Sequence, residues 1–274
     1  MGEGGNPCGS PVGAGRGITM SAMTQTVLLA IDTSTEYCSV ALLRSATAAG
    51  ADSSPQCWVR HELTGAVSST RVLPAIREVF AESGLTLADC DAIAFGAGPG
   101  SFTGLRTATG IAQGLAFGRA LPVVPVGTLL ACAEHARLRV PGTARVLAAL
   151  DARMDEVYWA DFAWDDAAGE WRTLHAAALD APGAVGVPDA PFTLAGNAAA
   201  AFGAQLPAAA RAAAIDADAL PHAVPIAHLA LRAYRAGRTV PADQAAPEYI
   251  RNKVAQTTAE RMAARALHPA GAPK

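Results

Sequence analysis

Long apolar runs are missing from this sequence. The longest, residues 27–31 and 93–97, reach only the length of a strand and fall well short of the roughly 20 residues that a membrane helix needs. Residues 1–23 are rich in glycine and lack the basic segment and apolar run of a secretory signal. We therefore expect a cytoplasmic protein with no membrane partner.

A pattern of metal-binding residues is also missing. The five cysteines (Cys8, Cys38, Cys57, Cys90 and Cys132) contain no C-x-x-C pair, which is typical of reduced thiols rather than of a disulfide framework or a zinc site. His222 and His228 are spaced so that one helical face cannot present both. The remaining histidines, which are isolated in the sequence, are His61, His135, His175 and His268. We expect no metal site in this chain.

Positive charge is scarce as well. The formal net charge is −3 and the pI is about 6.1. A protein that holds nucleic acid alone usually has a basic face that neutralises phosphates. If this chain acts on nucleic acid, we expect another subunit to make most of the contacts.

Material for hydrophobic cores is abundant, because 51% of the 274 residues are hydrophobic. A buried strand, an acidic turn and a second strand follow one another twice, at residues 27–43 and again at residues 146–162. This repetition predicts an α/β protein of two related lobes, which we place at residues 24–125 and 126–274. The composition of residues 1–23 predicts a disordered extension.

Apolar spacing predicts the helices. Residues 68–83 have the pattern of an amphipathic helix, capped by Ser69 or Thr70, and residues 103–117 that of a second helix. The further elements expected are strands at 57–63, 91–96, 121–126 and 191–196 and helices at 127–137, 226–236 and 256–267. Residues 163–190 are expected to be mainly loop.

The most distinctive segment, residues 98–106, lies between a strand and a helix, where free N–H groups could bind an anion. Its glycines and hydroxyls are Gly98, Gly100, Ser101, Thr103 and Gly104. Leu105 stands where a phosphate-binding loop has lysine, and the glycine spacing is not G-x-G-x-x-G. Pro99 and Thr103 replace the glycines of a nucleophile elbow. From the residues alone, a purely structural turn and an anion-binding loop both stay open.

This loop, Gly-Pro-Gly-Ser-Phe-Thr-Gly-Leu-Arg, closely resembles the signature of the bacterial TsaB family. Residues 30–35 resemble the family's opening turn, 71–76 its first helix, 151–158 its second-lobe opening and 247–251 its C-terminal signature. The matches occur in the family's order along most of the chain.

The resemblance implies two ribonuclease-H-like lobes of the actin, sugar-kinase and chaperone-ATPase superfamily. It also implies a non-catalytic scaffold that heterodimerises with a TsaD-type subunit, with a TsaE-type ATPase and tRNA joining through the complex. The complex transfers threonylcarbamoyl to the adenosine beside the anticodon. ATP and metal are used by the partner subunits, so we expect no cofactor on this chain alone. Homodimerisation without the partner is left open.

Catalytic residues are not expected. In active relatives the turn at Asp32, Thr33 and Ser34 carries a glycine that places phosphate, and Ser34 occupies that position here. The helical H-x-x-x-H pair of the TsaD branch is absent as well, so we interpret the turn as vestigial. Asp151 and Asp155 are interpreted as turn residues that bond their own backbone.

A partner interface is expected on the first-lobe helices. The residues proposed for it are Leu73, Ile76, Leu105, Arg106, Thr109, Gly110 and Gln113. The alternative for these side chains is packing within their own lobe. Two rival functions are a glycoprotease-like peptidase and a small-molecule kinase of the same fold. Ser101 has no identifiable base and the phosphate turn is incomplete, which argues against both.

Overall fold

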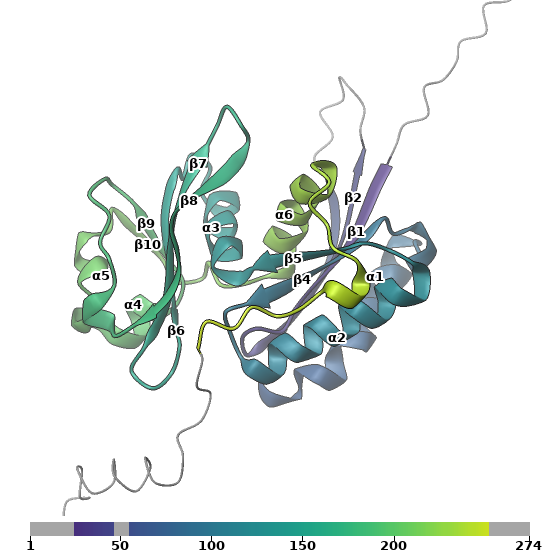
Figure 1. Cartoon of the computed structure of the whole chain (residues 1–274), viewed down its shortest axis with the longest axis horizontal. Coiled ribbons are helices and arrows are strands. Elements are labelled where there is room, and N and C mark those ends of the chain that lie inside the picture. Colours follow the sequence, from purple (N-terminus) through teal and green to yellow (C-terminus); the bar gives the residue numbers. More distant parts are fainter. Residues whose placement is uncertain (1–24, 47–54, 252–274) are drawn as a thin grey trace, which may run out of the picture.

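The computed structural model describes residues 25–46 and 55–251, which form two lobes that are each built on a five-stranded sheet (Figure 1). The first sheet has the order β3-β2-β1-β4-β5. Its strands are β1 (Gln25–Asp32), β2 (Tyr37–Ala46), β3 (Gln56–Leu63), β4 (Ala92–Gly98) and β5 (Val123–Gly127). The first three strands form an antiparallel meander, and β4 and β5 continue the sheet parallel to β1.

The second sheet has the order β10-β9-β6-β7-β8. Its strands are β6 (Arg145–Asp151), β7 (Val157–Asp165), β8 (Glu170–Asp180), β9 (Thr193–Ala195) and β10 (Ala214–Asp216). Again three strands form an antiparallel meander, and two more continue the sheet in parallel. The connectivity of the first sheet is therefore repeated, and the expected α/β fold of two ribonuclease-H-like lobes is confirmed.

Helices cover both faces of the first sheet, as the fully apolar run of β1 requires. Helices α1 (Ser68–Ser83) and α2 (Phe102–Arg119) pack side by side on one face. Helix α6 (Ala223–Arg235) packs on the other face, against the alternate residues of β1 (Figure 1). Helix α3 (Thr128–Arg139) lies between the lobes and contacts both α6 and β6.

The position of α6 corrects the assignment of residues 126–274 to the second lobe. The chain builds the second sheet and then returns to the first, where α6 contacts β1, β2 and β4. The physical reason is that β1 and β4 are buried on both faces of the sheet. The face opposite α1 and α2 is covered mainly by α6. The far face of the second sheet is covered by the short helices α4 (Ala198–Phe202) and α5 (Pro207–Arg211).

Within the described residues, the expected helices and strands are present with shifted ends, except in the region expected to be loop. There β8 extends over Glu170–Asp180 as an edge strand whose middle is exposed. Neither Ser69 nor Thr70 caps α1, since Val67 is the N-cap and Thr70 donates its hydroxyl to the Val67 carbonyl. The expected helix at 256–267 and the extension at 1–23 lie outside the described residues. No helix within the described ranges is long and apolar enough to cross a membrane.

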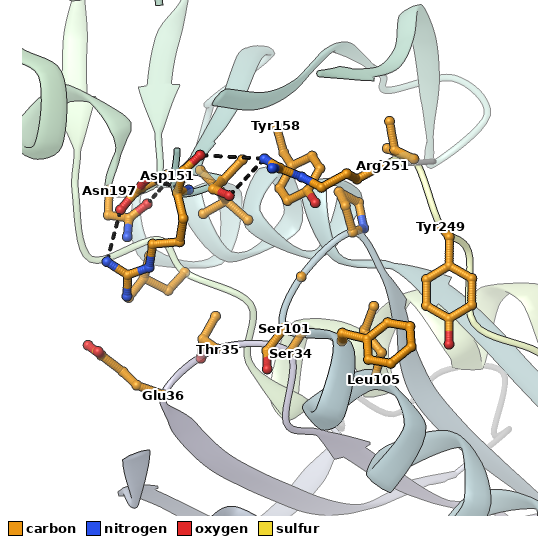
Figure 2. Close-up of a pocket in the computed structure, with 18 of the residues that line it drawn as sticks. Ser34, Thr35, Glu36, Ser101, Leu105, Asp151, Tyr158, Asn197, Tyr249 and Arg251 are labelled. Atoms are coloured by element: carbon orange, nitrogen blue, oxygen red, sulfur yellow. Dashed lines mark hydrogen bonds and ion pairs between the residues drawn. The ribbon is translucent and has the colours of Figure 1, made fainter. Parts of the chain in front are cut away.

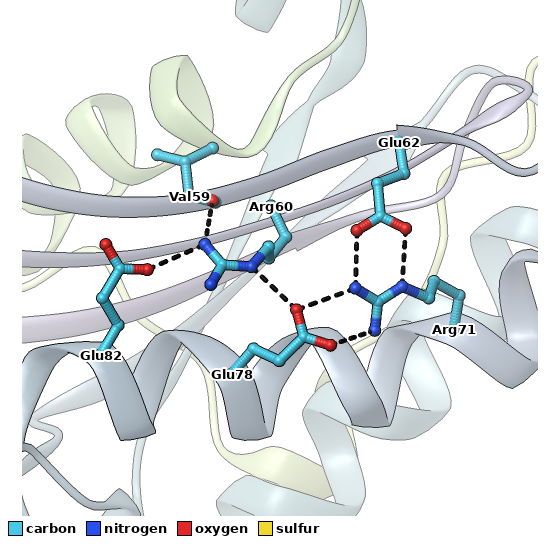
Figure 3. Close-up of polar contacts among 6 residues, drawn as sticks. All are labelled: Val59, Arg60, Glu62, Arg71, Glu78 and Glu82. Atoms are coloured by element: carbon cyan, nitrogen blue, oxygen red, sulfur yellow. Dashed lines mark hydrogen bonds and ion pairs between the residues drawn. The ribbon is translucent and has the colours of Figure 1, made fainter.

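A chain of ion pairs fixes α1 on the edge strand β3 (Figure 3). Arg71 of α1 pairs with Glu62 of β3 at 2.6 Å and with Glu78 of its own helix at 2.7 Å. Arg60 of β3 reaches Glu78 at 2.8 Å and Glu82 at 2.9 Å. Hydrogen bonds from Arg71 and Arg60 lower the pKa of the Glu78 carboxyl to about 2. These groups are solvent-accessible, so their main effect is to orient the helix rather than to stabilise the lobe.

Candidate functional site

The turn at residues 32–34 and the loop at residues 98–106 meet at the carboxyl ends of β1 and β4. The Ser101 N–H donates to the Ser34 carbonyl at 2.7 Å, and the Thr33 hydroxyl donates to the Gly104 carbonyl at 2.6 Å. A Cβ added at Gly100 would lie 2.6 Å from the Ser34 oxygen, and one at Gly104 would lie 1.7 Å from the Thr33 oxygen. These glycines let loop and turn pack in contact, which favours the structural interpretation of the loop.

The side chains of the loop serve the start of α2. Ser101 is its N-cap and accepts a hydrogen bond from the Gly104 N–H. Thr128, at the start of α3, donates its hydroxyl to the Pro99 carbonyl. Within the described residues, the Ser101 hydroxyl makes no hydrogen bond with a histidine or a carboxylate.

The carboxyl group of Asp32 is enclosed in the first lobe. Its Oδ2 accepts from the Ser34 hydroxyl at 3.0 Å, while Oδ1 is buried and without a partner among the described residues. A Cβ at Gly96 would lie 2.0 Å from Oδ1, so β4 closes this side. Burial raises the pKa of Asp32 to about 6, although the bonds from Ser34 oppose the shift. Asp32 is therefore fully buried and does not line the cavity between the lobes.

That space is a cavity of about 510 Å³, which we call the inter-lobe cavity (Figure 2). The first lobe contributes Ser34, Thr35, Glu36, Ser101 and Leu105, and the second contributes Asp151, Tyr158 and Asn197. Tyr249 and Arg251, from the C-terminal part of the described chain, complete the wall. The cavity is large enough for a small ligand.

The charges of the inter-lobe cavity do not suit a phosphate. Arg153 pairs with Asp151 at 3.2 Å, and Arg251 pairs with Glu156 at 2.6 Å. Both guanidinium groups of the lining are thus already neutralised, whereas the carboxylates of Glu36 and Glu248 are exposed. The described residues contain no cluster of His, Cys, Asp or Glu that could hold a metal ion.

In the acidic turn of the second lobe, Asp151 bonds its own backbone as the sequence predicts. Asp151 Oδ1 accepts from the Arg153 N–H at 2.8 Å, as expected of a residue that bonds its own backbone. Arg153, Met154 and Asp155 all have positive φ, between 58° and 62°. Such a left-handed run is unfavourable for residues with a Cβ, and the Arg251 guanidinium holds it by donating to the Ala152 carbonyl at 3.0 Å.

The C-terminal segment 245–251 connects the two lobes across this cavity. The Glu248 N–H donates to the Ala97 carbonyl of β4 at 2.7 Å. The Tyr249 ring lies on Phe102, and its hydroxyl accepts from Arg106 Nε at 3.0 Å. Two residues later, Arg251 binds the second lobe. The segment therefore ties the start of α2 to the turn of the second lobe.

Three histidines from different elements form a stack that the sequence did not predict. The ring of His222 lies 4.2 Å from that of His61 and 5.3 Å from that of His135, and Tyr37 stacks on His61 at 4.5 Å. The rings come from β2, β3, α3 and the N-cap of α6, which are far apart in the chain. No spacing rule could have brought them together.

Burial, followed by the neighbouring imidazoles His61 and His135, lowers the pKa of His222 to about 3. As the pH falls below about 6.5, the unfolded chain binds a proton at this residue but the folded chain does not, so stability is lost toward acid pH. At pH 5 the loss from His222 is about 2 kcal/mol, at 1.36 kcal/mol for each pH unit. His222→Asn retains an acceptor for the Val224 N–H and removes the titration.

We expect the unfolding free energy of His222→Asn to fall less between pH 7 and pH 5 than that of the wild type. Urea titrations at both pH values measure the difference. His175→Asn, which changes an exposed histidine on β8, is the matched control. If His222→Asn and the wild type lost the same unfolding free energy between pH 7 and pH 5, His222 would not be the source of the acid sensitivity.

Comparison with known proteins places the chain in a family. The model of the family "TsaD: tRNA N6-adenosine threonylcarbamoyltransferase" matches residues 61–270. Two solved structures from Pseudomonas aeruginosa are similar over 82% of this chain, each with a TM-score of 0.72. One is described as similar to the peptidase YeaZ, with 40% sequence identity and 100% of that chain covered. The other is named YeaZ, with 41% sequence identity and 99% of that chain covered. The "tRNA threonylcarbamoyladenosine biosynthesis protein TsaB" of Escherichia coli is 47% identical over 139 residues, 51% of this chain and 56% of that protein.

The chain belongs to the TsaB (YeaZ) family. The relative of the same name from Haemophilus influenzae is 49% identical over 137 residues, 50% of this chain and 54% of that protein. The aligned part of this chain thus spans about half the length of the curated TsaB relatives that it matches.

The residues proposed for a TsaB partner interface divide into two groups. Ile76, Leu105 and Thr109 are buried at 5%, 1% and 5% exposure, so their placement in an interface is corrected. Ile76 belongs to the core beneath α1 and α2. Leu105 lines the inter-lobe cavity, and the Thr109 hydroxyl donates to the Leu105 carbonyl at 2.7 Å. Leu73, Arg106, Gly110 and Gln113 are exposed or half-buried, and they stay candidates.

Proposed function

We propose that this chain is the non-catalytic scaffold of a complex that transfers threonylcarbamoyl to the adenosine beside the anticodon of tRNA. It acts by forming a heterodimer with a TsaD-type subunit, and the TsaE-type ATPase and tRNA join the heterodimer. ATP and metal are used by the partner subunits. Family membership supports this role.

The observation that carries the proposal is the outer surface of α1 and α2, which we call the α1/α2 face and define by Leu73, Gly110, Gly114, Phe117 and Gly118. Leu73 is 44% exposed and Phe117 is 80% exposed. A Cβ at any of the three glycines would meet no atom within 4 Å. An apolar surface with such low relief suits close contact with helices of another subunit, and aromatic side chains dominate interface cores.

The two enzymatic alternatives lack support at their sites. A peptidase would need a base beside Ser101, whose hydroxyl instead caps α2. A kinase would need phosphate-binding cations in the inter-lobe cavity, where Arg153 and Arg251 are already paired.

The experiment is to mix the purified chain with the TsaD-type subunit of the same organism and to measure the mass of the complex by light scattering. We expect one species with the summed mass of one copy of each chain. Even weak association is detectable at concentrations of about 100 μM. If the two proteins still elute separately at that concentration, the scaffold role is refuted. Peptide or ATP hydrolysis by the chain alone would favour the enzymatic alternatives.

A further inference from the structure

The inter-lobe cavity carries more negative than positive charge. The ionisable side chains that line it are Glu36, Asp151, Arg153, Glu248 and Arg251. The two guanidinium groups are already engaged, Arg153 with Asp151 at 3.2 Å and Arg251 with Glu156 at 2.6 Å. Glu36 and Glu248 are exposed, and neither forms an ion pair with a residue that the structure describes. Two negative charges of the lining are therefore not neutralised by the protein.

Tyr158 adds an unused hydroxyl group to the same cavity. The residue is 9% exposed, and it belongs to the cavity lining. Its hydroxyl points from β7 toward the loop that contains Ser101 (Figure 2), and it makes no hydrogen bond to any described residue. A tyrosine hydroxyl can accept a hydrogen bond from an N–H donor. Because enclosed polar groups are normally hydrogen-bonded, this oxygen is suited to a donor that enters the cavity.

Much of the remaining wall is apolar and comes from both lobes. Leu105 belongs to α2 of the first lobe, Leu150 to β6 of the second lobe, and Ile250 to the C-terminal segment. Apolar walls with a few polar groups are typical of small-molecule sites. Walls of low dielectric constant also strengthen the field of the carboxylates at the cavity.

We propose that the inter-lobe cavity binds a small organic cation, of the class of amines with an apolar body. The ammonium group donates to the Tyr158 hydroxyl and is attracted by the carboxylates of Glu36 and Glu248. The apolar body lies against Leu105 and Leu150, so the ligand contacts both lobes. The lining shares no residue with the α1/α2 face, and the proposal therefore does not depend on the scaffold role.

The test is a calorimetric titration of the full chain, at low salt and about pH 7, with 4-phenylbutylamine. The neutral and anionic probes of the same body are 4-phenylbutanol and 4-phenylbutyrate. We expect saturable binding of the amine, at least about fivefold tighter than that of the alcohol, and no saturation by the carboxylate. The preference for the amine should shrink in about 0.5 M NaCl, because salt screens partly exposed charges. Equal affinity for amine and alcohol, or tighter binding of the carboxylate, would overturn the proposal.

Two nearly isosteric variants test the polar groups. Tyr158→Phe removes only the hydroxyl, and we expect it to weaken the amine about fivefold. Glu248→Gln removes one negative charge, and it should weaken the amine about threefold while the alcohol is unaffected. Asp243→Asn removes an exposed carboxylate that does not line the cavity, so it should bind as the wild type does. Wild-type affinity for the amine in both Tyr158→Phe and Glu248→Gln would refute the assignment of these groups.

Two larger substitutions test the location. Thr35→Phe fills the cavity from the first lobe, and Ile250→Trp fills it from the C-terminal segment. Each should abolish saturable binding of the amine, because the added ring occupies the space of the ligand. A folded filling variant that binds the amine as tightly as the wild type would place the ligand elsewhere. Thermal unfolding shows which of the two variants is folded, and Ile250→Trp decides if Thr35→Phe is not.

Discussion

Gly114→Arg is expected to abolish association with the TsaD-type subunit while the chain stays folded. Gly114 lies in the middle of α2, exposed, with nothing within 4 Å of an added Cβ. Replacing a helical glycine gains up to about 1 kcal/mol of helix propensity, so the melting temperature should not fall. In the complex, an arginine on the α1/α2 face would hold the subunits apart or bury an unpaired charge, at a loss of at least about 3 kcal/mol, or roughly 100-fold in affinity.

The measurement is calorimetric titration of the TsaD-type subunit with wild type, Gly114→Arg and a control. Ala200→Arg adds the same side chain at an exposed position of α4 in the second lobe, and it should bind as the wild type does. Wild-type affinity in a folded Gly114→Arg variant would show that the partner binds elsewhere.

Asp32→Asn is expected to stabilise the chain above pH 7. The folded pKa of Asp32 is raised from 3.8 to about 6 by burial, so the folded chain binds this proton more tightly than the unfolded chain does. Stability from this group is therefore present below pH 4 and is lost as the pH rises to about 6. The loss is about 3 kcal/mol at neutral pH, at 1.36 kcal/mol for each unit of pKa shift.

The asparagine oxygen can still accept from Ser34, but its amide adds a buried donor, so the net gain at pH 8 should be about 1 to 3 kcal/mol. Urea unfolding between pH 4 and pH 8 measures the difference from the wild type, which should shrink toward pH 4. Glu36→Gln changes an exposed carboxylate of the same turn and should show no such trend. If Asp32→Asn were destabilised equally at every pH, the carboxylate would be needed for the fold, and burial would not oppose its ionisation.

The lobes were predictable because their signals are local. The apolar run of β1, the spacing along α1 and the glycine loop each depend on neighbouring residues, and the structure places all of them as expected. The edge strand β8 was missed because its exposed middle shows no apolar alternation and is followed by further alanines, which are poor strand formers. The position of α6 could not be predicted in this way, because it depends on which sheet face is left without a helix when the whole chain has folded.

The candidate sites were less predictable for the same reason. An apolar side chain on a helix suits a core and an interface equally, so Ile76 and Leu105 could be assigned only from their burial. The histidine stack and the inter-lobe cavity are formed by residues from different elements. The role of Gly100 and Gly104 also became clear only from the carbonyls of the opposing turn.

The central claim is that this chain is required for tRNA modification without performing the transfer. Its most direct test is the threonylcarbamoyladenosine content of tRNA, measured by mass spectrometry after reaction of threonylcarbamoyl adenylate with the TsaD-type and TsaE-type subunits. We expect product with the wild-type chain, background without it or with Gly114→Arg, and background with the chain alone. Full product in the absence of this chain, or product from the chain alone, would contradict the account.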